Sequence, residues 1–152
     1  MSILVVGSVA YDAVEVPTGV LEEALGGSAT YFSVAGSFFT NVSVVAVVGK
    51  DFLGSDIDIL RERNIDLSGL EHRDGKTFRW AGRYMTEDVN IRETLDTQLN
   101  VFADFSPTLG DVHGKKPFLF LANIDPELQM DVLKQMRTRP KLVALDTMNF
   151  WI

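Results

Sequence analysis

Four short apolar runs are spread along the chain. They occupy residues 3–6, 42–48, 118–122 and 142–145, and only the second contains a polar residue, a single serine. Each run has the length of a strand and is too apolar for one face to meet water, which is typical of strands covered on both sides. We therefore predict a sheet with other elements packed on both faces.

Segments with helical spacing lie between these runs. They cover residues 29–39, 55–63 and 126–136, with Ser55 as the expected N-cap of the second. In the third segment, one helical face is apolar, with Leu128, Val132, Leu133 and Met136. Alternation of strands and helices predicts an α/β fold, a mostly parallel, doubly wound sheet of Rossmann-like type.

Residues 76–86 depart from this rhythm. Phe78 and Trp80 alternate there with polar residues, as in a strand with one packed and one wet face. Residues 14–16 and 98–105 are candidate partners. We expect a small antiparallel sheet that stands away from the main sheet as a lid, and an antiparallel extension of the main sheet is the alternative.

Composition indicates one folded domain. The chain has 152 residues, of which 46% are hydrophobic and 23% charged, close to the average for globular proteins. It has no cysteine, which excludes disulfides and thiolate metal sites, and its only histidines are His72 and His113. Both histidines lie in polar stretches, so we expect them at the solvated surface and expect no metal site.

The net charge of −7 lies mainly in the N-terminal part, where residues 1–60 hold seven acids and one base. No basic run is longer than Lys115–Lys116, so the chain lacks the positive surface with which proteins bind phosphate backbones. We expect no nucleic-acid partner. The apolar runs are too short to span a bilayer, so we expect no membrane association and a cytoplasmic location.

In open α/β sheets, ligands bind outside the carboxyl ends of the strands. Asp12 follows the first predicted strand and offers two acceptor oxygens to ligand hydroxyls; its alternative role is that of a turn residue. Gly26 and Gly27 precede the first helix, where free backbone N–H groups favour oxygen-rich ligands. The glycine spacing matches neither a Walker loop nor a dinucleotide-binding turn.

Two further polar segments follow strands. Residues 48–54 read as a turn and helix cap, which is a simpler role than direct ligand contact. Residues 146–149 follow the last apolar run and place polar side chains at the expected ligand mouth.

Taken in order, these segments resemble the N-terminal half of PfkB (ribokinase-like) carbohydrate and nucleoside kinases. The resemblance covers the whole chain and depends on the glycine pair, the V-G-x-D-x-x-G turn at residues 48–54 and the strand end at residues 146–149, where Asp-Thr-Met-Asn is similar to the family's D-x-N. It implies a ribokinase-like fold with a small antiparallel β lid, whose strands we expect from about residues 13–18 and 76–105.

The resemblance also implies a substrate site. In that family, the residue matching Asp12 holds substrate hydroxyls, and the backbone at the glycine pair closes on the substrate. Tyr31 stands where many members have a sugar-binding asparagine. The implied substrate-binding residues are Asp12, Gly26, Gly27, Ser28, Tyr31 and Asn149.

In the family, the nucleotide pocket and a G-A-G-D segment with the catalytic base belong to the C-terminal half. This sequence contains no G-A-G-D segment. We therefore expect residues 1–152 to form one partial domain that lacks catalytic residues and is inactive alone. ATP and magnesium are implied for the full-length parent, and we expect neither to bind this half tightly.

The function predicted from the sequence is the substrate-binding and lid half of an ATP-dependent sugar kinase. Its expected partners are a small sugar or nucleoside and a second copy of the chain, bound through the lid. A non-catalytic sugar-binding or dimerisation module is the alternative from another class. An unrelated Rossmann-type nucleotide binder is disfavoured, because the first glycine turn lacks the required spacing.

Overall fold

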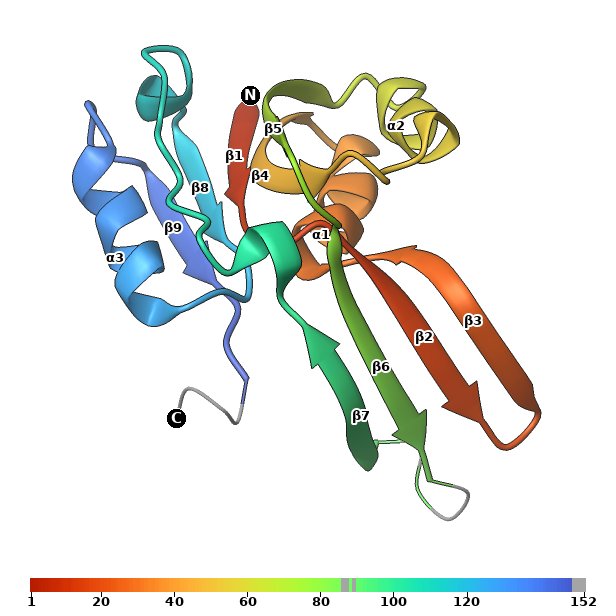
Figure 1. The fold of residues 1–152 in the computed structure, drawn as a ribbon. Helices are drawn as coiled ribbons and strands as arrows, with labels where there is room; N and C mark the ends of the chain where they lie inside the picture. Colours follow the sequence, from red (N-terminus) through yellow and green to blue (C-terminus); the bar gives the residue numbers. More distant parts are fainter. Residues whose placement is uncertain (86–87, 89, 149–152) are drawn as a thin grey trace.

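The computed structural model describes residues 1–85, 88 and 90–148. Its main sheet has five strands in the order β5-β4-β1-β8-β9, and all neighbours are parallel (Figure 1). These strands are β1 (Ser2–Val6), β4 (Asn41–Gly49), β5 (Asp66–Arg73), β8 (Phe118–Leu121) and β9 (Leu142–Leu145). The four strands predicted from apolar runs are confirmed, as is the mostly parallel α/β sheet.

Helices cover both faces of this sheet. Val5 and Val44 point to the face where α1 and α2 pack, together with Leu60 of α2. Val45 points to the opposite face, against Val132 of α3. The helices are α1 (Ser28–Ser37), α2 (Gly54–Arg61) and α3 (Pro126–Gln135), and two short 3₁₀ turns are η1 (Asn100–Phe102) and η2 (His113–Lys115). Alternate residues of the central strands therefore belong to two cores, which explains their unbroken apolar sequence.

A second sheet of four strands projects from one end of the main sheet (Figure 1). We call it the lid sheet. Its order is β3-β2-β6-β7. The strands are β2 (Ala10–Val16), β3 (Gly19–Gly26), β6 (Phe78–Tyr84) and β7 (Arg92–Gln98). It is a separate sheet rather than an extension of the main one.

The lid sheet is mixed, whereas an antiparallel sheet was expected. Its central pair, β2 and β6, is parallel, and the two outer pairs are antiparallel. The reason is topological. β2 follows β1 and β6 follows β5, and the carboxyl ends of β1 and β5 meet at one edge of the parallel sheet. Two strands that leave the same edge run in the same direction.

Other sequence expectations need correction. The partner strand expected at residues 98–105 lies at Arg92–Gln98, because the apolar Val101 and Phe105 pack under the main sheet instead. β3 and β5 were not predicted; they are outer strands whose sequences contain many polar residues. β9 is also an outer strand, and its apolar side chains are exposed among the described residues.

Three local details complete the fold. Helix α2 begins at Gly54 after Leu53, with no side-chain cap, so the prediction of Ser55 as N-cap is wrong. His72 is exposed as expected, but His113 is buried at 7% exposure, where its Nε2 lies 3.2 Å from the Ser68 hydroxyl. Among the described residues, no helix is long and apolar enough to cross a membrane.

Packing of α2 on the sheet gives a first prediction. Leu60 is 1% exposed, whereas its neighbour Ile59 is 43% exposed. Leu60→Ala removes buried methyl groups and leaves a cavity, so we expect a loss of ~2–5 kcal/mol in the free energy of unfolding. Ile59→Ala serves as the control, with an expected loss of about 1 kcal/mol or less. Urea unfolding measures both, and equal losses would contradict this packing of α2.

Candidate ligand-binding site at the base of the lid

The predicted site residues Asp12, Gly26 and Gly27 come together where the lid sheet joins α1. Asp12 lies on β2, and its carboxylate accepts a hydrogen bond from the Gly27 N–H. A Cβ atom at Gly26 would overlap that carboxylate. Only glycine at position 26 therefore leaves room for the Asp12 side chain in this position.

Gly27 is the N-cap of α1 and has a φ of 93°, in the region that favours glycine. A Cβ atom there would overlap the backbone of Ser8. The N–H groups of Ser28 and Ala29 donate to the Ser8 hydroxyl (3.2 Å) and carbonyl (3.0 Å), respectively. These two N–H groups are thus already bonded, and the expectation that the glycine pair leaves them free for a ligand is wrong.

Two other predicted residues also lie at this place. The Ser28 hydroxyl is 3.2 Å from the Ser8 hydroxyl. Tyr31 lies on the first turn of α1 with its side chain 61% exposed, and its N–H donates to the Gly27 carbonyl. Its pKa is raised, first by partial desolvation and then by the nearby charge of Asp12 and by Tyr84. Asn149 lies outside the described residues.

The Asp12 carboxyl is poorly solvated. Burial raises its pKa above the usual range, and the bond from Gly27 offsets part of this effect. A carboxylate with little water around it gains more from a hydroxyl that donates to it than an exposed carboxylate does. The arrangement therefore suits recognition of a ligand rich in hydroxyl groups.

Aromatic and polar side chains border Asp12 on the lid sheet. Trp80 is its direct neighbour in the parallel β2–β6 register; the Trp80 ring covers Gly82, and its Nε1 donates to Thr94. A shallow pocket of about 240 Å³ opens beside these residues. It is lined by Tyr11, Asp12, Ala13, Glu22, Glu23, Arg79, Trp80, Ala81, Asp96 and Gln98.

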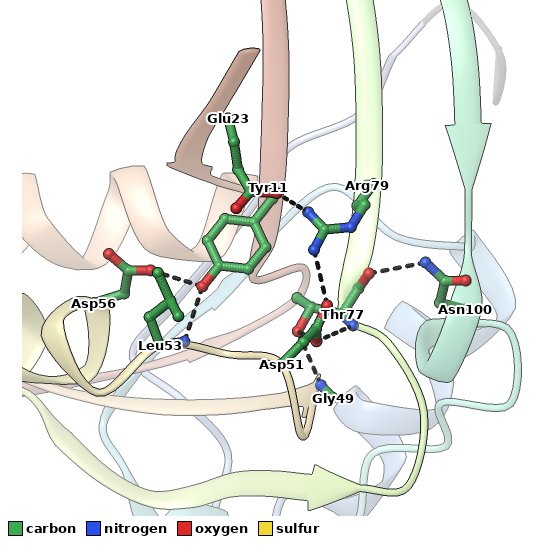
Figure 2. Close-up of polar contacts among 9 residues, drawn as sticks. All are labelled: Tyr11, Glu23, Gly49, Asp51, Leu53, Asp56, Thr77, Arg79 and Asn100. Atoms are coloured by element: carbon green, nitrogen blue, oxygen red, sulfur yellow. Dashed lines mark hydrogen bonds and ion pairs between the residues drawn. The ribbon is translucent and has the colours of Figure 1, made fainter. Parts of the chain in front are cut away.

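A network of polar contacts ties the lid sheet to the turn after β4 (Figure 2). Asp51 accepts two hydrogen bonds from Thr77, through its N–H and its hydroxyl (both 2.7 Å), and one from Arg79 (2.8 Å). Burial alone would raise the pKa of Asp51, but these bonds outweigh it and hold the pKa below the usual value. Asp51 is therefore ionised at neutral pH.

Arg79 extends this network to the outer strand of the lid sheet. Its guanidinium pairs with both Asp51 and Glu23 of β3 and lies 4.9 Å from the centre of the Tyr11 ring. The Tyr11 hydroxyl accepts from the Leu53 N–H (2.9 Å) and donates to a neighbouring carboxylate. That carboxylate is Asp56 of α2, at 2.7 Å.

The sequence analysis did not predict this network. It assigned residues 48–54 to a turn and cap, which is compatible with Asp51 but omits its partners on β6. The V-G-x-D-x-x-G turn was the sequence signal for this network. Its aspartate directly follows a buried strand, so its carboxylate needs hydrogen-bond donors from neighbouring segments.

The N–H groups at the start of α1 already have acceptors within the chain. The Ser28 and Ala29 N–H groups donate to Ser8, and the pocket beside them is bordered by the acidic Asp12 and Glu23. No group of three or more His, Cys, Asp or Glu among the described residues is placed to hold a metal.

Comparison with solved structures identifies the fold. The chain is similar to a Methanocaldococcus jannaschii nucleoside kinase of the ribokinase family, with a TM-score of 0.71 and 18% identity over 95% of this chain and 52% of that one. A Cryptococcus neoformans ribokinase in complex with ADP gives 0.70 and 17%, over 95% and 48%. A Halothermothrix orenii fructokinase gives 0.70 and 16%, over 96% and 57%.

The chain thus has the ribokinase-like α/β fold that the sequence resemblance implied. It spans about half the length of the solved kinases it matches. No protein-family model and no curated protein matches the sequence.

The raised pKa of Asp12 gives a second prediction. A carboxyl whose pKa is higher in the folded state destabilises the fold when ionised, and this cost fades as pH falls through the raised pKa. We expect Asp12→Asn to leave stability unchanged or raise it by about 1 kcal/mol or less at pH 7.

Thermal unfolding between pH 4 and pH 8 measures this effect. The difference in unfolding temperature between Asp12→Asn and the parent is expected to become smaller toward acid pH. Asp58→Asn, on the exposed side of α2, should show no such trend. A large loss of stability in Asp12→Asn at pH 7 would contradict this prediction and assign Asp12 a structural role in β2.

Proposed function

We propose that this chain is the substrate-binding and lid half of an ATP-dependent sugar or nucleoside kinase. The observation that carries the proposal is the Asp12 carboxylate, held at the base of the lid sheet by Gly27 and given room by Gly26. The similar solved structures support it, because their names describe a nucleoside kinase, a ribokinase and a fructokinase. One is a complex with ADP, and another, a sugar kinase from Pyrococcus horikoshii, is in complex with ATP.

In this proposal, Asp12 accepts hydrogen bonds from two ligand hydroxyls and orients the ring that carries them. Tyr31, one turn into α1, replaces the asparagine expected from the family, and its exposed ring covers the ligand beside Asp12. The lid sheet then excludes water from the ligand. Phosphoryl transfer depends on groups that this sequence does not contain, so this half positions the substrate and does not catalyse alone.

The third prediction tests binding directly. Ribose, fructose and adenosine are titrated into the parent chain by calorimetry, with ATP and Mg²⁺ added in a parallel assay of ADP release. We expect one of the three to bind without turnover. Asp12→Ala should weaken that binding about 10- to 100-fold, the usual effect of losing a hydrogen bond to a charged group.

Asp58→Ala is the matched control, since it removes an acid from exposed α2 and is expected to bind like the parent. Tyr31→Asn, which restores the residue expected from the family, should shift the preference among the three ligands. The proposal fails if none of them binds, or if Asp12→Ala binds as tightly as the parent. ADP release at the usual kinase rate of about 1–100 per second would contradict the inactivity of this half.

A role in dimerisation is the second candidate, favoured by an apolar surface on the lid sheet. Val16, Val20 and Leu21 of the β2–β3 hairpin are 41%, 67% and 53% exposed. Phe78, by contrast, stacks on Phe102 at the base of the lid sheet, with ring centroids 5.2 Å apart. We therefore do not include its ring in the pairing surface. We propose that two chains pair through the β2–β3 hairpins.

Leu21→Lys tests this pairing and is the fourth prediction. A charge in an apolar contact is costly to bury, so we expect the variant to be a monomer where the parent is a dimer. Met130→Lys, at a residue 52% exposed on α3, is the control and should remain a dimer. Light scattering after size exclusion measures both. A monomeric parent at high micromolar concentration would refute the pairing.

A further inference from the structure

We propose that Asp51 is a positioning residue that sets the orientation of the lid sheet relative to the main sheet, acting through Thr77 and Arg79. Its consequence for ligand binding at Asp12 rests on the proposed function. Its effect on the lid sheet does not, and can be measured without any ligand.

Both carboxylate oxygens of Asp51 accept hydrogen bonds from the same segment of the lid sheet. Oδ1 accepts the N–H and the hydroxyl of Thr77, each at 2.7 Å, and Oδ2 accepts an Arg79 N–H at 2.8 Å. These donors lie at the start of β6, whereas Asp51 lies in the turn after β4 of the main sheet. One carboxylate therefore connects the two sheets (Figure 2).

Thr77 is the centre of this connection. Its side chain is fully buried, and its hydroxyl also accepts the Gly49 N–H at 3.0 Å. A Cβ atom at Gly49 would overlap the backbone of residues 75–77, so the chain entering β6 lies directly on the end of β4. The Lys50 N–H donates to the Gly75 carbonyl in the same contact.

The return strand of the β6–β7 hairpin is fixed at the same point. The Asn100 side chain, just beyond β7, donates to the Thr77 carbonyl at 2.9 Å, and the Val101 N–H donates to the Lys76 carbonyl. Both ends of the hairpin thus meet at Thr77. A shift of Thr77 would move β6 and β7 together.

Arg79 links β6 to the other strands of this side of the lid sheet, β2 and β3. It pairs with Asp51 and with Glu23 on the far strand β3, and it lies over the Tyr11 ring of β2. Since Asp12 follows Tyr11 and pairs with Trp80 of β6, the direction of β6 determines where the Asp12 carboxylate stands. Asp51 influences the candidate site through these contacts and does not touch the ligand.

The test compares two changes at Thr77, of which Thr77→Val keeps the side-chain shape and Thr77→Ser loses one buried methyl group. Thr77→Val removes the hydroxyl that joins Asp51 to Gly49, whereas Thr77→Ser retains it. Asp51→Asn removes the charge and replaces one acceptor oxygen with an NH₂ donor, which then faces the donors of either Thr77 or Arg79. Asp58→Asn is the control for loss of an acidic charge at an exposed position. Hydrogen exchange of backbone amides in each intact chain, followed by mass spectrometry, reads out every strand separately.

We expect Thr77→Val and Asp51→Asn to speed exchange in β2, β6 and β7 roughly tenfold or more, the usual effect of losing a buried hydrogen bond to a charged group. Exchange in β1, β4 and β8 should stay at the parent rate, except at Gly49 in Thr77→Val, whose N–H loses its acceptor. Thr77→Ser and Asp58→Asn should keep the parent pattern across the lid sheet. Parent-like exchange in the two disruptive variants would overturn the proposal. Equal acceleration in all strands would also overturn it, because Asp51 would then support the whole fold rather than the lid sheet.

A binding measurement separates this inference from the proposed function. If a polyol ligand binds the parent, Asp51→Asn should weaken it while Asp58→Asn does not, and Thr77→Ser should bind better than Thr77→Val. Parent-like affinity in Asp51→Asn would refute the link to Asp12. If no ligand binds the parent, the proposed function fails, whereas the exchange pattern still decides the role of Asp51.

Discussion

The contact between the end of β4 and the start of β6 determines how the two sheets of this protein meet. All parallel strands of the main sheet end at the same edge, and the chain continues from that edge into the next element. After β1 and β5 it continues into β2 and β6, which form the central pair of the lid sheet. Their direction is then set by few contacts, of which the buried Thr77 and the ionised Asp51 are the most constrained. A partly buried carboxylate is tolerated here because its donors are provided by the strand it holds.

The candidate site uses the same edge. Asp12 requires glycine at position 26, and the left-handed backbone of Gly27 turns the chain into α1 while its N–H bonds Asp12. This arrangement costs stability, since a partly buried carboxylate is kept with a single backbone donor. A cost of this kind, away from the main core, is typical of residues retained for binding.

The sequence predicted those strands that are covered on both faces. The strands β1, β4 and β8 lie between two covered faces, so nearly every residue is apolar and the pattern is clear. Outer strands have no such environment: β3 contains consecutive glutamates, and β5 is largely polar. Val101 and Phe105 caused the opposite error, because a strand was predicted where there is none. Their apolar side chains pack in the core from a segment outside the strands.

The candidate site was predictable to the extent that its residues are close in sequence or match a family pattern. Asp12, Gly26, Gly27, Ser28 and Tyr31 lie at one place as expected, although the helix N–H groups are already bonded to Ser8. The Asp51 network joins residues 26 to 28 positions apart, and no periodicity reports such a contact.

Binding of hydroxyl-bearing ligands at Asp12, beneath the lid sheet, is tested most directly by amide chemical shifts. In a titration of the ¹⁵N-labelled chain with ribose or adenosine, the account predicts saturable shifts at Gly27, whose N–H bonds the Asp12 carboxylate, and at Tyr31. Saturable shifts confined to other regions, such as α3, with Gly27 unmoved, would contradict it.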